Sequence, residues 1–404
     1  MRKVAIFTGN RAEYGLQLPV IRAVDNHPEL VYSLIVSGAH LDPRFGCTLD
    51  EIKRDGVRID AEVSIDISIE SPYATSQAIG SAIIGLSNAL AQISPDMLVV
   101  YADRFEGFSA VVAASQMNIP TVHIEGGDLT EGGAHDDSVR HAMTKLSHLH
   151  FTTNQQSTNR ILAMGEEPWR VHTVGLPAGD LIAQRCYATA TEVCEKLLLD
   201  LDRPVLLFTQ HSVSTEYEQS TSQIRPSLEA INTLADLGVQ CILTYPNNDA
   251  GGLQIVRELE NLRSRQHANI QLHRSLGRHL YHGVLALALN HNHRITCVGN
   301  SSSGLKETPF FMCPTVNIGT RQNGRLCGGN IINCDYSYTA ILSAVNKALY
   351  NEEFRALCRT SSNPYGIGNT ATKIADILAH TALDERLIRK RMTIQGVVSD
   401  GWYQ

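Results

Sequence analysis

The sequence lacks long apolar runs, cysteines at metal-binding spacing and an excess of positive charge. No apolar stretch approaches the ~18 residues that a membrane-spanning helix needs, and the apolar run that follows the basic start is too short for a signal peptide. The nine cysteines are scattered without CxxC spacing, which favours free thiols in a reducing cytoplasm over disulfides or a zinc site. A formal net charge of −7 disfavours a nucleic-acid partner but leaves room for a local phosphate pocket. These absences predict a cytoplasmic protein with neither a membrane nor a nucleic-acid partner.

Three common nucleotide-binding signatures are also missing. The turn after the first expected strand is not GxGxxG, so a dinucleotide fingerprint is absent. The serine-rich loop Gly299–Gly304 lacks the Lys-Ser/Thr ending of a P-loop. The DxD motif of many metal-dependent glycosyltransferases is not evident either.

Short β-branched runs alternate with longer amphipathic stretches along the chain, which predicts an α/β fold with parallel sheets covered by helices on both faces. Strands are expected at Lys3–Thr8, Val31–Val36, Met97–Tyr101, Pro120–Ile124, His150–Thr153 and Val171–Val174, and then at Pro204–Thr209, Val239–Thr244, Ile270–Leu272, Arg294–Val298 and Thr315–Ile318. Helices are expected at Leu16–Asp25, Ile79–Ile93, Gly107–Met117, Ser138–Ser147, Ile224–Asp236, Gly251–Ser264, Leu276–Ala288, Tyr336–Leu349 and Thr370–Ala382.

The pattern loosens after residue 178 and then restarts, so we expect two doubly wound, Rossmann-like domains at residues 1–178 and 179–383. The mostly polar stretch 384–404 is expected to be a tail that either packs back onto the first domain or becomes ordered in an oligomer. Doubly wound sheets bind ligands at the carboxyl ends of their strands, so the chemistry is expected at strand-to-helix junctions that face a cleft between the domains.

Two junctions of the first domain carry charged side chains. After the first strand, Gly9 permits a tight turn, and Arg11 together with a helix N-terminus makes an anion site. After a central buried strand, Asp103 and Arg104 are costly unless they are used or paired. The alternatives are an ordinary turn with a solvated arginine in the first case, and an aspartate N-cap with local pairing of Arg104 in the second.

A third junction of the first domain gathers carboxylates. Glu125 ends a strand and precedes two glycines, and Asp136 and Asp137 precede a helix. Carboxylates that converge perturb one another's pKa values, as acid–base catalysis requires. The two aspartates could instead cap the helix, and a magnesium site is a weaker alternative.

The second domain offers a histidine and a serine-rich loop. His211 follows its first strand and could serve as a proton shuttle or a phosphate partner, with His273 a weaker candidate. Ser301 and Ser302 open a helix between glycines, as in a phosphate cradle, and Glu307, one to two turns into that helix, could reach a ribose. Arg321 adds a cation near the next strand end.

In their order and spacing these junctions resemble the UDP-N-acetylglucosamine 2-epimerase family, of GT-B architecture, over nearly the whole chain. The strings that carry the resemblance are Arg11–Gly15, Ser37–Leu41, Asp103–Glu106, Ile124–Gly127, Asp136–Ala142, Gly299–Gly304 and Gly319–Gln322. Ser37–Leu41 and Asp136–Ala142 look most like the hydrolysing branch, which makes N-acetylmannosamine for sialic acid or a related sugar for legionaminic acid.

The resemblance implies a chemistry and a set of roles. UDP leaves by anti elimination across C1–C2, and water then adds to the 2-acetamidoglucal to give the free 2-epimer, with no cofactor, metal or nicotinamide. It implies a homodimer as well. The implied acid–base set is Asp103, Glu125 and Asp136 (or Asp137), with His211 near the sugar or phosphate; Arg11, Ser301, Ser302 and Arg321 hold the diphosphate, Glu307 holds the ribose, and Arg104, Arg140 and His273 complete the substrate contacts.

Some alternatives stay open. The same chemistry on UDP-2,4-diacetamido-2,4,6-trideoxyglucose differs only in the sugar, and a non-hydrolysing epimerase would return a UDP-sugar. A GT-B glycosyltransferase would need an acceptor surface, for which the sequence gives no sign. The sequence departs from the family at Gly15, where relatives often have a side chain that contacts phosphate, and at Ala102, where glycine is more usual.

Overall fold

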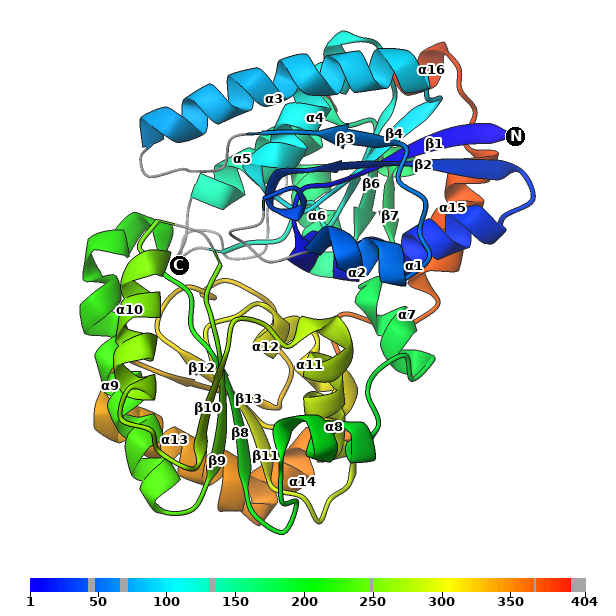
Figure 1. The fold of residues 1–404 in the computed structure, drawn as a ribbon. Helices are drawn as coiled ribbons and strands as arrows, with labels where there is room; N and C mark the ends of the chain where they lie inside the picture. The colour runs from blue at the N-terminus through cyan, green and yellow to red at the C-terminus, as the bar shows by residue number, and fades with distance from the viewer. Residues whose placement is uncertain (43–47, 66–71, 131–134, 248–249, 367, 394–404) are drawn as a thin grey trace. The chain divides into compact units, whose positions relative to one another are not determined.

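The computed structural model describes the chain except for residues 43–47, 66–71, 131–134, 248–249, 367 and 394–404. It divides into two compact units (Figure 1). The first comprises Met1–Asp128, Asp136–Asp180 and the C-terminal segment from Tyr365, and the second comprises Leu129–His135 and Leu181–Pro364. The division falls inside α7 (Ala178–Ala183).

The first unit is built on a seven-stranded sheet in which every pair of neighbouring strands is parallel. In spatial order the strands are β3 (Ala61–Val63), β2 (Leu30–Ser37), β1 (Arg2–Thr8), β4 (Met97–Tyr101), β5 (Thr121–Ile124), β6 (Leu149–Thr152) and β7 (Val171–Thr173). Strand order reverses between β1 and β4, where Ile6 is in register with Val99. That reversal is the switch point at which doubly wound sheets open a binding crevice.

Alternating side chains of β1 face two separate cores. Val4 and Ile6 pack with α1 (Arg11–Asn26) and α15 (Thr370–His380), whereas Ala5 and Phe7 pack with α3 (Pro72–Ile93) and α4 (Phe105–Gln116). Figure 1 shows α1 and α15 on one face of this sheet and α3 and α4 on the other. The unit also contains α2 (Thr48–Arg54), α5 (His135–Leu146), α6 (Gln155–Ala163) and α16 (Glu385–Ile388).

The second unit has a six-stranded sheet, again with parallel neighbours, and its order reverses between β8 and β11. Its strands in spatial order are β10 (Ile270–His273), β9 (Gln240–Thr244), β8 (Val205–Thr209), β11 (Ile295–Gly299), β12 (Thr315–Ile318) and β13 (Ile331–Cys334). One face packs on α9 (Ser220–Asp236), α10 (Gly252–Arg263), α13 (Tyr338–Tyr350) and α14 (Glu352–Thr360), and the other on α8 (Ala190–Leu197) and α11 (Gly277–Ala286). The two doubly wound sheets confirm the predicted fold class.

The second unit ends earlier in the structure than the sequence predicts: at Pro364 rather than at residue 383. Residues from Tyr365 on belong to the first unit, because α15 packs on α1 and contributes Ile374 and Leu378 to the core there. Both carboxylate oxygens of Asp180 accept the backbone N–H groups at the start of α15, from Thr370 at 2.8 Å and Ala371 at 2.6 Å.

The described part of the tail also packs on the first unit. The Lys390 ammonium donates to the Ser147 carbonyl at 2.5 Å and lies 2.8 Å from the Glu166 carboxylate. Within the described residues, no helix is long and apolar enough to cross a membrane.

Candidate active site

A strained turn presents Asp103 at the switch point of the first sheet. The chain leaves β4 through Ala102, whose φ of 57° lies in the left-handed region that a Cβ disfavours. Arg104, with extended backbone angles, is the N-cap of α4 without a side-chain capping bond. Asp103 therefore does not cap α4, and its carboxylate has another partner.

That partner is Arg140, a guanidinium buried on the inner face of α5. Its Nη2 donates to Asp103, and its Nη1 donates to Asp137 Oδ1 at 2.7 Å and to the Asp128 carbonyl at 2.7 Å. The side chain of Arg140 is only 2% exposed, against 18% for Asp103 and 16% for Asp137. A buried fork of charge-assisted bonds thus fixes two partly exposed carboxylates side by side.

Glu125 and Asp136 are the other two members of the expected carboxylate set. Glu125 follows β5, the neighbour of β4, is buried, and has a φ of 70°. Asp136 and Asp137 lie inside the first turn of α5, so neither is its N-cap, and acidic side chains there suit the helix dipole. The structure therefore brings Asp103, Asp137 and Arg140 together, with Glu125 at the end of the adjacent strand.

A second, buried pair of carboxylates lies under the first junction. Glu13 accepts the Gly9 N–H at 3.0 Å, and a side-chain Cβ at Gly9 would meet Glu106, which is fully buried. Burial first, and then the charge of Glu106, raises the pKa of Glu13 to about 8. Arg104 Nε lies 3.6 Å from Glu106, so this arginine pairs locally.

The predicted anion site at α1 is described only for its backbone. Asn10 is the N-cap and accepts from the Glu13 N–H at 3.0 Å, so the helix begins at Arg11, five residues earlier than its apolar pattern predicts. The side chain of Arg11 lies outside the described residues.

In the second unit, Asn300 joins the two strands that flank the switch point. Its side-chain Oδ1 accepts the His211 N–H at 2.6 Å, and its Nδ2 donates to the His211 carbonyl at 2.9 Å. Its own carbonyl accepts from Arg321 Nη1 at 3.2 Å and Gln322 Nε2 at 2.8 Å. Asn300, which is 1% exposed, therefore ties His211, Arg321 and the start of the serine loop into one cluster.

The hydrogen bonds of His211 determine which ring nitrogen carries its proton. Nδ1 accepts the backbone N–H of Asn247 at 3.0 Å, so Nδ1 is unprotonated and the proton of the neutral ring lies on Nε2. A ring held in this form can donate a hydrogen bond through Nε2. The Nδ1 lone pair is already occupied by the Asn247 N–H, so the ring has no lone pair left with which to take a proton. This favours a role for His211 as a hydrogen-bond donor to phosphate or sugar over a role as a proton shuttle.

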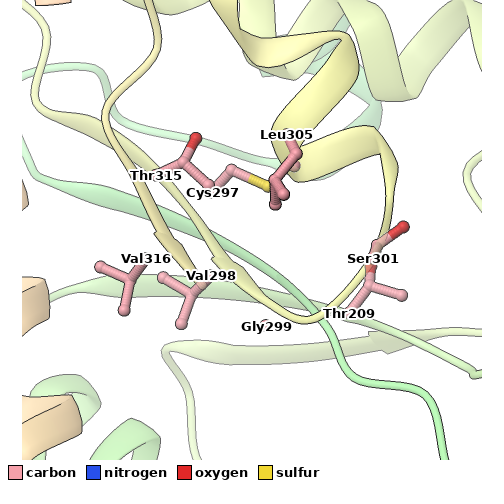
Figure 2. Close-up of a pocket in the computed structure, with 9 residues that line it drawn as sticks. Thr209, Cys297, Val298, Gly299, Ser301, Leu305, Thr315 and Val316 are labelled. Carbon is pink, nitrogen blue, oxygen red and sulfur yellow. The ribbon is translucent and has the colours of Figure 1, made fainter. Parts of the chain in front are cut away.

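The serine loop leaves β11 through a turn that only glycine can occupy. Gly299 has a φ of 129°, and a Cβ there would lie 1.9 Å from the Thr209 carbonyl oxygen. Figure 2 shows the small pocket under this loop, with Ser301 and Thr209 at one end and Cys297, Leu305 and Thr315 at the other.

Glu307 is held by a histidine that the sequence did not indicate. The helix after the loop, α12 (Ser303–Lys306), has only four residues, so Glu307 is its C-cap rather than one to two turns inside it. Its Oε2 lies 2.5 Å from Nε2 of the buried His282. The pKa of Glu307 is lowered: burial is the largest single influence and raises it, but the bond and charge of His282, together with Ser303 and Lys306, outweigh burial.

His273 lies farther from the switch point. It ends β10, the edge strand, with β9 between it and β8, and burial lowers its pKa. Among the described residues, no group of three or more His, Cys, Asp or Glu is placed to hold a metal ion.

Comparison with known proteins shows the family. The family model described as UDP-N-acetylglucosamine 2-epimerase matches residues 22–379. A relative from Legionella pneumophila, named UDP-N,N'-diacetylbacillosamine 2-epimerase (hydrolyzing), is 32% identical over 390 residues, 96% of this chain and 99% of the relative. A UDP-N-acetylglucosamine 2-epimerase from Neisseria meningitidis serogroup B is 32% identical over 359 residues, 88% of this chain and 90% of the relative.

A solved structure has the same fold. The UDP-GlcNAc 2-epimerase of Neisseria meningitidis, bound to UDP-GlcNAc, matches with a TM-score of 0.77 at 19% identity, covering 94% of this chain and 99% of that one. The fold is thus GT-B-like, with two Rossmann-like domains, as the sequence predicts. The chain belongs to the UDP-N-acetylglucosamine 2-epimerase family and is a UDP-sugar 2-epimerase.

Proposed function

We propose that this chain is a hydrolysing 2-epimerase that removes UDP from UDP-N-acetylglucosamine and releases N-acetylmannosamine. The observation that carries the proposal is the cluster at the end of β4, where Arg140 holds Asp103 and Asp137 and Glu125 ends the next strand. Elimination needs a carboxylate at C2 and a proton donor when water adds back, and a set of adjacent carboxylates supplies both roles.

The proposal divides the roles between the units. Proton transfer belongs to Asp103, Glu125 and either Asp136 or Asp137, of which Asp137 is the one bonded to Arg140. Arg140 orients Asp103 rather than contacting UDP. The departing diphosphate is assigned to Ser301, Ser302, Arg321 and the Nε2–H of His211, together with Arg11, and the ribose to Glu307. Preformed donors of this kind stabilise the charge that develops on a leaving group.

The hydrolysing outcome is supported by the Legionella relative, whose name includes it and which covers nearly the whole chain. The same relative favours a second candidate substrate, UDP-2,4-diacetamido-2,4,6-trideoxyglucose, which is the sugar its name describes. Both substrates share the C2 acetamido group and the UDP leaving group, so the same residues serve either one.

A product assay with both UDP-sugars tests the proposal. Each is incubated with the protein, and UDP, free sugar and UDP-linked epimer are separated and quantified. Release of UDP with free N-acetylmannosamine supports the proposal; release from the trideoxy sugar alone changes the substrate to the second candidate. A UDP-linked 2-epimer without free sugar identifies a non-hydrolysing enzyme and contradicts the hydrolytic step.

Two further expectations belong to this proposal. The homodimer implied by the family resemblance is checked by sedimentation velocity, where a single monomeric species would contradict it. The cytoplasmic location inferred from the scattered cysteines accords with the free thiols of all eight cysteines in the described ranges.

A further inference from the structure

His123 is a buried histidine next to the carboxylate cluster, and the proposed function gives it no role. It lies in β5, two residues before Glu125, and its side chain is fully buried. A buried ring with two polar nitrogens is costly unless both are bonded. Both are, and their partners lie on the two elements that carry Asp103 and Arg140.

The first partner is the strained turn itself. Nε2 lies 2.6 Å from the carbonyl oxygen of Ala102, the residue with φ of 57° that immediately precedes Asp103. A carbonyl only accepts, so Nε2 carries the proton and donates it. The Ala102 N–H in turn donates to the Ile124 carbonyl at 3.0 Å, so both ends of this peptide turn are tied to β5.

The second partner is Thr144 of α5. Nδ1 lies 3.0 Å from Thr144 Oγ1, and with the proton on Nε2 the hydroxyl must donate. Thr144 stands one helical turn after Arg140, whose guanidinium holds Asp103 from the other side. The pair also explains Gly126: a Cβ there would lie 2.8 Å from Thr144 Oγ1 and 2.9 Å from His123 Nδ1.

The ring stays uncharged in the folded protein. Burial is the main cause that lowers its pKa, to about 3, and it outweighs the bond to the Ala102 carbonyl, which raises the pKa. His123 is therefore a fixed donor to Ala102 across the neutral pH range.

From this geometry we infer that His123 is a positioning residue of the acid–base site: it holds the left-handed Ala102 turn and so fixes where Asp103 presents its carboxylate. The inference rests on the proposed function, since it acts through Asp103. Small displacements of a reacting group cost up to about 10²-fold in rate, so the turn has reason to be braced.

Two substitutions separate the two bonds of the ring. In His123→Gln the amide nitrogen reaches the position of Nε2 and can still donate to Ala102, so most of the kcat should remain. In His123→Asn the shorter side chain keeps an acceptor for Thr144 but cannot reach Ala102, and kcat should fall about 10- to 100-fold. The KM for the UDP-sugar should change little in both variants, because UDP binding is assigned to other residues.

His148 is the matched control. It is a buried histidine that immediately precedes β6, and its Nδ1 accepts the N–H of Thr121, the first residue of β5, at 3.0 Å. Burial lowers its pKa to about 4. His148→Gln and His148→Asn should change the melting temperature without the split in kcat. This separates a positioning role from a general loss of stability.

The outcomes decide between the inference and the proposed function. If the wild type is active and His123→Gln and His123→Asn have the same kcat, whether high or low, the inference is wrong but the proposed function stands. A wild type that releases no UDP from any UDP-sugar overturns the proposed function and this inference with it. If the variants fail to fold, long-range ¹H–¹⁵N spectra of the wild-type histidines decide, since a proton on Nδ1 of His123 at pH 7 contradicts the inference.

Discussion

At the residue scale, the chemistry depends on side chains whose partners lie far away in the sequence. Arg140 lies 37 residues from Asp103 and Asn300 lies 89 residues from His211, yet each pair is hydrogen-bonded. The sequence predicted the junction residues because they follow strands. It did not predict their partners, because Arg140 looked like one more substrate contact and Asn300 like one more residue of a polar loop.

Asp103→Asn tests the acid–base assignment. Asparagine keeps the size of the side chain but cannot accept a proton, so turnover should fall by about 10²- to 10⁴-fold. UDP binding, measured by titration calorimetry, should be largely unchanged, because UDP is assigned to Arg11 and to residues of the second unit and not to Asp103. Loss of UDP binding together with turnover would instead give Asp103 a structural role.

His211→Gln and His211→Leu test whether this histidine donates a hydrogen bond or transfers a proton. The glutamine amide can place a donor near the position of Nε2, whereas leucine cannot. If His211 only donates, His211→Leu should lose about 10²- to 10³-fold in kcat and His211→Gln much less. Equal losses in the two variants, seen in steady-state kinetics, would show that a titrating imidazole is required.

At the scale of elements, the strands were easier to predict than the helices, since α2, α6 and α14 were not among the expected helices. The expected strands match the observed ones to within a residue or two, because buried parallel strands are continuous apolar runs. β3 and β13 were missed; each is short and lies at a sheet edge, where one partner strand suffices. The helix at Arg11 starts early because Asn10 caps it, a local signal that the apolar pattern starting at Leu16 concealed.

Ala102→Gly tests the strain in the turn before Asp103. Glycine adopts a φ of 57° without a Cβ penalty, so this variant should raise the free energy of unfolding by about 1 kcal/mol. Ala91→Gly, on the exposed face of α3, is the control and should lower it by about 1 kcal/mol. Urea unfolding measures both, and an Ala102→Gly variant no more stable than wild type would mean that the turn carries no strain.

At the scale of the whole molecule, the sequence predicted two doubly wound halves but not where the chain returns to the first. Nothing in the amphipathic pattern of α15 specifies which sheet it covers. That choice depends on Asp180 capping its N-terminus and on the packing of Ile374 and Leu378 against α1.

The pH dependence of global stability tests the buried Glu13–Glu106 pair. The pKa of Glu13 is raised to about 8 from 4.5, so between these values the folded state binds a proton that the unfolded state has lost, and stability falls as pH rises. Glu13→Gln removes this loss while keeping an acceptor for the Gly9 N–H. The free energy of unfolding of Glu13→Gln, relative to that of the wild type, should therefore increase between about pH 5 and pH 8.

Urea unfolding at several pH values measures that difference, with Glu29→Gln as the control because Glu29 is exposed. The control should show a difference from wild type that stays nearly constant across the range. A Glu13→Gln difference that is also constant, or that shrinks toward pH 8, would contradict a protonated Glu13 in the folded protein.

The central claim is that a carboxylate of the first unit removes the C2 proton as UDP leaves. The most direct measurement is proton NMR of the reaction in D2O with UDP-N-acetylglucosamine and, in parallel, the trideoxy UDP-sugar. The account predicts UDP and a free 2-epimer that carries deuterium at C2. A free sugar that keeps its C2 proton and its original configuration would show simple hydrolysis at C1 and contradict the account.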